Sequence, residues 1–139
     1  MLQFFSASTS IVNSKRAIAE CLEIALEGEP NLDCDLIFFY TAMGHNFKEL
    51  LSEAIRISPN ARIVGCTCAG VIGREGPNEN LKALAIMAIK GTSEEFAVVV
   101  SKTNKNMDTY ETGVRMAQEL KRTNPDISMI HFLPSAFPL

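Results

Sequence analysis

The chain has 139 residues with no tryptophan, only two histidines, and 16 acidic against 13 basic side chains. The resulting net charge of −3 supplies no basic surface for a phosphate backbone, so we expect no nucleic-acid partner. No apolar run reaches the roughly 18 residues that a membrane span needs. The first ten residues (MLQFFSASTS) also lack the basic segment that opens a secretory signal. We therefore expect a cytoplasmic protein with no membrane partner.

The four cysteines and two histidines lack the spacing of a metal site. Cys66 and Cys68 are separated by one residue, whereas zinc knuckles use Cys-x2-Cys or His pairs. His45 and His131 lie far apart in the sequence. The dinucleotide motif G-x-G-x-x-G and the P-loop are also missing. The sequence therefore predicts free thiols, no metal and no cofactor.

Strand and helix patterns alternate along the first half of the chain. The composition, 47% hydrophobic and 21% charged, is that of a globular protein, and we expect a single α/β domain over residues 1–139. The patterns predict strands at residues 2–8, 35–41 and 61–66, and helices from Asn13 to Gly28 and from Asn46 to Pro59. Such an order indicates parallel strands joined by right-handed crossovers.

The second half changes pattern. Residues 81–90 and 95–101 read as two strands with a short turn between them, which predicts a hairpin. Asp108 followed by Glu111 resembles a capping box that opens a helix, and a last strand is predicted from Ile127. The predicted fold class is α/β, with a mixed β-sheet flanked by helices in the order β-α-β-α-β, then a β-hairpin and a final α-β.

The most distinctive segment is GCTCAGVIG at residues 65–73, directly after the third predicted strand. In open α/β sheets, ligands bind in the crevice outside the carboxyl ends of the strands, and glycines let the backbone approach a ligand closely. Small polar side chains at the ends of the first two strands would face the same crevice if the three strands are parallel neighbours. The candidate ligand-binding residues are Ser6, Ser8, Thr41, Gly65, Cys66, Thr67, Cys68 and Gly70.

Plainer interpretations of these residues stay open. The segment also fits a tight turn in which small residues let two layers pack closely, and hydroxyls at strand ends are ordinary caps. Arg74 and Glu75 follow the segment directly. They are either an exposed ion pair or a pair that orients the two ends of a zwitterion.

Cys66 supports an enzymatic alternative, a cysteine-dependent hydrolase or transferase in which a histidine activates the thiolate. His45 lies in a loop, whereas His131 lies within an apolar strand pattern that is more typical of a hydrogen-bonded core histidine. Free cysteines are commonly small buried hydrophobes, so we expect no enzyme and no catalytic residue. A third alternative is an assembly domain whose exposed last strand pairs with another chain.

The stretch SPNARIVGCTCAGVIG at residues 58–73, with Asp35 and Leu36 opening the preceding strand, resembles the N-terminal part of a FIST domain. The order of elements is similar along essentially the whole chain. The resemblance implies a sensory domain of a signal-transduction protein that binds a small ligand such as an amino acid, without catalysis.

The resemblance also implies a partner, a C-terminal FIST domain or a signalling output module. The family's domain runs past the last residue of this chain, so we expect residues 1–139 to be a fragment that lacks the C-terminal portion. Family members usually have a hydroxyl residue where this chain has Cys68, and often an acidic residue where it has Val71. If the family's acidic residue holds a ligand's ammonium group, its loss in this chain implies a changed ligand preference.

Overall fold

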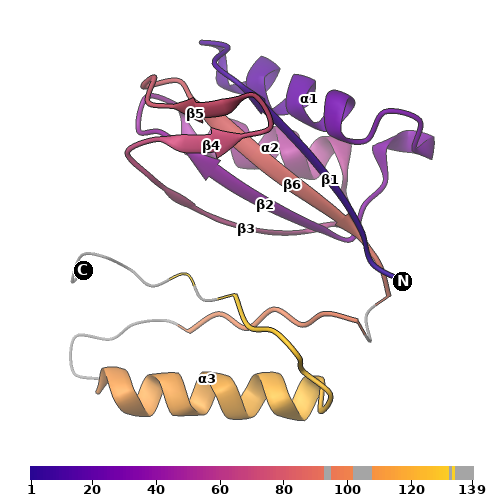
Figure 1. Cartoon of the computed structure of the whole chain (residues 1–139), viewed down its shortest axis with the longest axis vertical. Helices are drawn as coiled ribbons and strands as arrows, with labels where there is room; N and C mark the ends of the chain where they lie inside the picture. Colours follow the sequence, from indigo (N-terminus) through magenta and orange to yellow (C-terminus); the bar gives the residue numbers. More distant parts are fainter. Residues whose placement is uncertain (93–94, 102–107, 132, 134–139) are drawn as a thin grey trace. The chain divides into compact units, whose positions relative to one another are not determined.

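The computed structural model describes residues 1–92, 95–101, 108–131 and 133. The chain separates into two compact units, Met1–Gly91 (unit 1) and Thr92–Leu139 (unit 2), and each is described by itself. The α/β fold class is confirmed, since the described residues combine a four-stranded mixed sheet and a two-stranded ribbon with three α-helices (Figure 1). That the whole chain forms one domain stays a prediction.

The main sheet of unit 1 has the strand order β1-β6-β2-β3. Its strands are β1 (Gln3–Thr9), β2 (Leu36–Thr41), β3 (Arg62–Thr67) and β6 (Leu84–Lys90). β2 and β3 are parallel, and β6 runs antiparallel to both of its neighbours. β1, β2 and β3 therefore share one direction, as predicted, but β6 lies between β1 and β2, which are not neighbours.

Two helices connect these strands, and the predicted caps begin both of them. In α1 (Ser14–Ala25) the side chain of Asn13 accepts a hydrogen bond from the Arg16 amide at 3.0 Å. In α2 (Phe47–Ile57) the Asn46 side chain accepts from the amides of Lys48 and Glu49. Each cap satisfies amides that a helix start leaves without partners. A short 3-10 turn, η1 (Pro30–Leu32), leads into β2.

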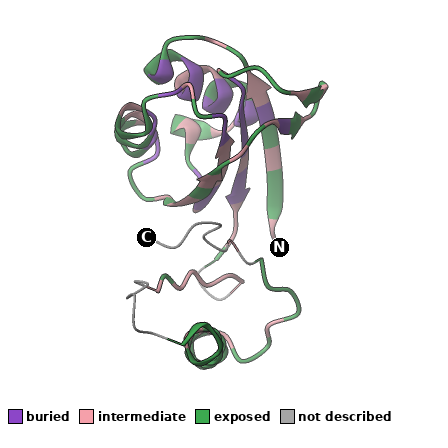
Figure 2. Cartoon of the chain, turned by 90° about the vertical axis from the view of Figure 1, so that its left-hand side faces the viewer, coloured by how far each residue is buried: buried purple, intermediate pink, exposed green. Residues whose placement is uncertain are grey.

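The core of unit 1 lies between these two helices and one face of the sheet, called here the helix face (Figures 1 and 2). The helices contribute a buried stripe at helical spacing, including Ile18, Leu22 and Leu50. The strands contribute alternate residues such as Ala7 and Ile37. The fully buried large side chains are Ile18, Leu22, Leu26, Ile37, Leu50 and Leu84.

The opposite face of the sheet, called here the ribbon face, carries a second and smaller core. A two-stranded antiparallel ribbon, β4 (Val71–Gly73) and β5 (Gly76–Asn78), lies against it (Figure 1). Val71 packs there with Ala42, Ala83 and Ala85. The ribbon contacts β1 and β6 near the carboxyl end of β1, at the edge of the sheet where the sequence predicts a ligand crevice.

The predicted hairpin of residues 81–101 is wrong. Its first strand exists as β6, but β6 is paired on both sides by β1 and β2, so no edge is left for residues 95–101, which form no strand. The chain leaves the sheet at Gly91, whose amide donates to the Asp35 carboxylate at 2.8 Å. A hairpin does follow β3, but it is the short ribbon β4–β5.

Unit 2 contains α3 (Thr109–Thr123), which begins at Asp108 as predicted, where the side chain accepts from the Tyr110 amide at 2.8 Å. Glu111 in its first turn and the basic Lys121 and Arg122 in its last turn suit the helix dipole. The strand predicted from Ile127 is not found over the described residues 127–131 and 133. Residues 132 and 134–139 lie outside the described part.

Candidate functional site

The strand register places Ser8 and Cys66, which are 58 residues apart in sequence, in one row across the sheet. Ser8 pairs with Ala85, Ala85 with Tyr40, and Tyr40 with Cys66. Paired residues project to the same face, so all four side chains lie on the ribbon face. The row crosses all four strands near the carboxyl ends of the three that run in one direction.

The ribbon crosses the β1 end of this row. The Ser8 hydroxyl donates a hydrogen bond to the carboxylate of Glu75, in the turn between β4 and β5. Directly after the end of β1, Ser10 Oγ accepts from the Asn78 side-chain amide at 2.7 Å. The Ser8 hydroxyl and the neighbouring Arg74 hold the pKa of the Glu75 carboxyl below its usual range. Glu75 is therefore an ionised, exposed acceptor beside the row.

Cys66 is the other end of the row, Cys68 follows it two residues later, and both are half-buried. The Cys68 amide donates to the Thr41 carbonyl at 3.0 Å, which continues the β2–β3 ladder one step beyond the end of β3. Cys68 packs with Tyr40 against the small core under the ribbon. Burial, and then the nearby Cys66, raises the pKa of the Cys68 thiol. Burial also raises the pKa of the Tyr40 hydroxyl.

The eight candidate residues do not share one crevice. Ser6, Ser8, Cys66 and Cys68 lie on the ribbon face. Thr41 and Thr67 pair with each other and project to the helix face, where Thr41 is only 1% exposed and its hydroxyl donates to the Ala42 carbonyl. That any of the eight binds a ligand stays a prediction.

The two candidate glycines lie close to neighbouring backbone. A Cβ on Gly65 would fall 2.0 Å from the Phe39 carbonyl oxygen of the neighbouring strand. A Cβ on Gly70 would fall 3.0 Å from the Asn78 carbonyl oxygen of the ribbon. Gly65 lies within β3 and is crowded by a neighbouring strand of its own sheet, so the interpretation as a turn that lets two layers pack closely fits Gly70 alone.

A buried polar junction that the sequence did not reveal ties the two helix starts together. His45 is 5% exposed, and its Nε2 lies 2.8 Å from the Lys82 carbonyl oxygen, to which it must donate. Its Nδ1 lies within hydrogen-bond distance of the Ser14 hydroxyl oxygen, 3.2 Å away. Ser14 Oγ in turn accepts from the Asn46 amide at 2.9 Å. A serine at a helix start and a loop histidine give no signal in sequence that they will meet.

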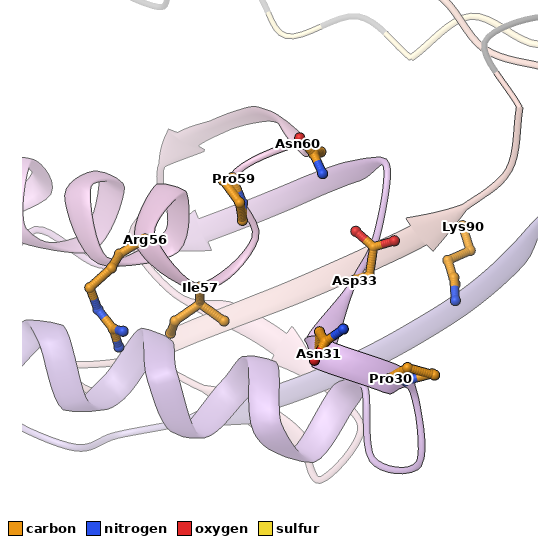
Figure 3. A pocket seen from close by; sticks show the side chains of 8 residues that line it. All are labelled: Pro30, Asn31, Asp33, Arg56, Ile57, Pro59, Asn60 and Lys90. Atoms are coloured by element: carbon orange, nitrogen blue, oxygen red, sulfur yellow. The ribbon is translucent and has the colours of Figure 1, made fainter.

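A hollow of about 540 Å³ opens at the opposite edge of the sheet, where β2 and β3 begin. Figure 3 shows Arg56 at one end of it and Lys90 at the other, with Asp33 between them. Both cations already have carboxylate partners, because Arg56 pairs with Glu53 at 2.6 Å and Lys90 pairs with Glu29. The remaining lining residues are Pro30, Asn31, Ile57, Pro59 and Asn60.

Residues 35–138 match the model of the FIST N domain. The chain therefore belongs to the FIST family, whose domain is a sensory domain of signal-transduction proteins. No curated protein matches the chain. Among the described residues, no helix combines the length and apolar character needed to cross a membrane.

Proposed function

We propose that this chain is a small-ligand-sensing domain that binds a small polar metabolite such as a free amino acid between the tip of the β4–β5 ribbon and the row from Ser8 to Cys66. The observation that carries the proposal is the contact between Glu75 and Ser8. It brings a charged loop onto the carboxyl end of β1, at the edge where three strands of one direction end and where open α/β sheets bind ligands.

The charges at the ribbon tip suit a zwitterion. The Glu75 carboxylate, whose pKa is lowered, accepts hydrogen bonds from an ammonium group. The adjacent Arg74 guanidinium can pair with a carboxylate in a bidentate manner. Ser8 and Ala85 in the row beneath are small, so the ligand's side chain would be directed along the row toward Tyr40.

Sensing would follow from competition for Glu75. In the free protein the Glu75 carboxylate accepts from Ser8, and an ammonium group on the ligand would take over this acceptor. The ligand would then favour a second position of the ribbon by its difference in affinity for the two. A C-terminal FIST domain or an output module in the cytoplasm would respond to that change.

The absence of catalysis is part of the proposal. Cys66 projects to the ribbon face, whereas both ring nitrogens of His45 are already used in the buried junction with Ser14 and the Lys82 carbonyl. This arrangement supports a binding role over a thiol enzyme, because an activated cysteine needs a base within hydrogen-bond reach.

Thermal unfolding against a panel of free amino acids tests the proposal. A ligand at about 100 times its Kd, bound only to the folded state, stabilises by about 2.7 kcal/mol and raises the midpoint by several degrees. Glu75→Gln should abolish the rise, whereas Glu23→Gln, an equal change of charge at an exposed position of α1, should leave it intact. An equal rise in both variants would remove Glu75 from the site, and no rise with any amino acid would refute the ligand class.

A further inference from the structure

We propose that Cys66 and Cys68 form a two-thiolate site for a soft monovalent cation, Cu(I) being the biologically available example. The proposal does not rest on amino-acid sensing, because it uses neither Glu75 nor the ribbon tip.

The two thiols project side by side from one strand. Cys66 lies on the ribbon face by its pairing with Tyr40, and the bond from the Cys68 amide to the Thr41 carbonyl keeps the chain extended to Cys68. Residues two apart on a strand share a face and lie about 6.6 Å apart, at about 3.3 Å per residue. Cys68 and Tyr40 also pack against the same small core.

This spacing suits a bridging cation better than a disulfide. A disulfide needs Cβ atoms about 3.8 Å apart, and parallel side chains on a strand hold them at nearly twice that. Metal–thiolate bonds of about 2.3 Å place two sulfurs about 4.6 Å apart when one cation lies between them. Rotation of the two side chains can bring the sulfurs from the spacing of the residues to this shorter distance, so the strand need not bend.

The number of donors selects the kind of metal. In the part of the chain that the structure describes, no group of three or more His, Cys, Asp or Glu side chains could hold a metal ion. Structural zinc takes four ligands, and iron–sulfur clusters take four thiolates. Two thiolates alone satisfy a soft cation with linear coordination, and thiolates are the donors that Cu(I) prefers.

The surroundings favour a dry site that remains open to exchange. On one side Cys68 contacts the apolar cluster of Ala42, Val71, Ala83 and Ala85. On the other, Cys66 lies on β3, the edge strand of the sheet. A hydrogen bond with the backbone of Gly70 favours the Cys68 thiolate, against the burial that raises its pKa.

Binding is a proton exchange without a redox step. Each thiol loses its proton to solvent, two sulfur–metal bonds form, and the site changes from neutral to a complex with one negative charge. Affinity for the cation therefore rises with pH while the thiols are being deprotonated.

The matched controls are the two other cysteines, Cys21 and Cys34. They are 0% and 1% exposed, and burial raises the pKa of Cys21 to about 12 and also raises the pKa of Cys34. Neither thiol is available to a cation in the folded protein.

The experiment is an anaerobic titration of the reduced full chain with Cu(I) in competition with bathocuproine disulfonate, with folding checked by far-UV circular dichroism. We expect one Cu(I) per chain. Loss of a residue that only hydrogen-bonds to a metal ligand weakens metal binding by about 10–100-fold. Loss of a ligand itself, in Cys66→Ser or Cys68→Ser, should therefore weaken Cu(I) binding by about 100-fold or more. Cys21→Ala and Cys34→Ala should bind as the original chain does.

Unchanged affinity in either serine variant would overturn the proposal, as would one Cu(I) shared between two chains. A second measurement on the unsubstituted chain covers the case of a misfolded variant. Bound Cu(I) should protect Cys66 from iodoacetamide, as read by peptide mass, and equal labelling of Cys66 with and without Cu(I) would also overturn the site. Glu75→Gln, which removes the proposed ammonium contact and does not touch the two thiols, should leave Cu(I) binding unchanged, so the two proposals fail separately.

Discussion

Gly73 of the ribbon lies directly over Ser8 of β1, so closely that a Cβ on Gly73 would fall 2.1 Å from Ser8 Oγ and 2.4 Å from Ser8 Cβ. No rotamer of Ser8 relieves the second contact, because Cβ is fixed by the backbone. The close approach of these two residues is what lets Glu75, two positions further along, reach the Ser8 hydroxyl.

Gly73→Ala should therefore displace the ribbon or strain β1. Overpacking of this kind costs typically about 1–3 kcal/mol, measured as the free energy of unfolding in urea. Ser8→Gly in the same background removes the obstructing Cβ and should recover part of the loss. No recovery in the double variant would show that the contact is not the cause.

Ser14→Ala should destabilise unit 1, because it leaves His45 Nδ1 and the Asn46 amide without their shared partner in a buried site. A buried polar group left unsatisfied costs about 1–3 kcal/mol. The control is Ser52→Ala on the exposed surface of α2, where changes are usually within about 0.5 kcal/mol. Equal urea midpoints for the two variants would contradict the role of the junction.

Alkylation by iodoacetamide should be slow at Cys68 near neutral pH. Because burial and Cys66 raise the pKa of this thiol, a smaller fraction is thiolate than in free cysteine, and the rate should climb as the pH rises toward the raised pKa. Labelling with peptide mass analysis also tests the thiol-enzyme alternative at Cys66. A rate at Cys66 faster than that of free cysteine near pH 7 would favour that alternative.

Two glycine-to-alanine substitutions should change the stability of the protein in opposite directions. Gly113 lies within α3 with open space around it and no left-handed backbone, so alanine should favour the helix by about 0.5–1 kcal/mol. Gly76 in the ribbon has equally open space but a φ of +107°, where alanine is strained. Increased helicity by circular dichroism is expected for Gly113→Ala, and a lower unfolding midpoint for Gly76→Ala. A change of stability in the same direction for both variants would contradict this effect of the positive φ at Gly76.

The sequence predicted the elements of unit 1 well because each carries a local signal. Asn13 and Asn46 are side-chain caps whose bonds form within three residues, and the apolar segments 35–41 and 61–66 are strands within a residue or two of the predicted bounds. Such signals do not depend on the rest of the chain.

The partners of the strands could not be predicted in the same way. Residues 84–90 are buried on both faces of the sheet, which marks a strand but does not say that β1 and β2 will take both of its edges. β4 and β5 have three residues each, too few for any periodicity. The one signal for them is Gly73-Arg74-Glu75-Gly76, in which glycines flank a two-residue turn.

The candidate site residues lie on two faces of the sheet, which the sequence also could not show. Thr41 and Tyr40 are adjacent in sequence, but side chains alternate along a strand, so Thr41 is buried against the helices while Tyr40 lies on the ribbon face. A list of polar residues at strand ends mixes the two faces until the register is known.

Mapping of backbone amide chemical shifts by NMR, as an amino acid that raises the unfolding midpoint is titrated into the full chain, tests the proposed site most directly. We expect the changes to gather at Ser8 and at residues 65–78, with those at the Glu75 amide among the largest. Changes confined to the hollow between Arg56 and Lys90, at the opposite edge of the sheet, would contradict the proposed site and move ligand binding there.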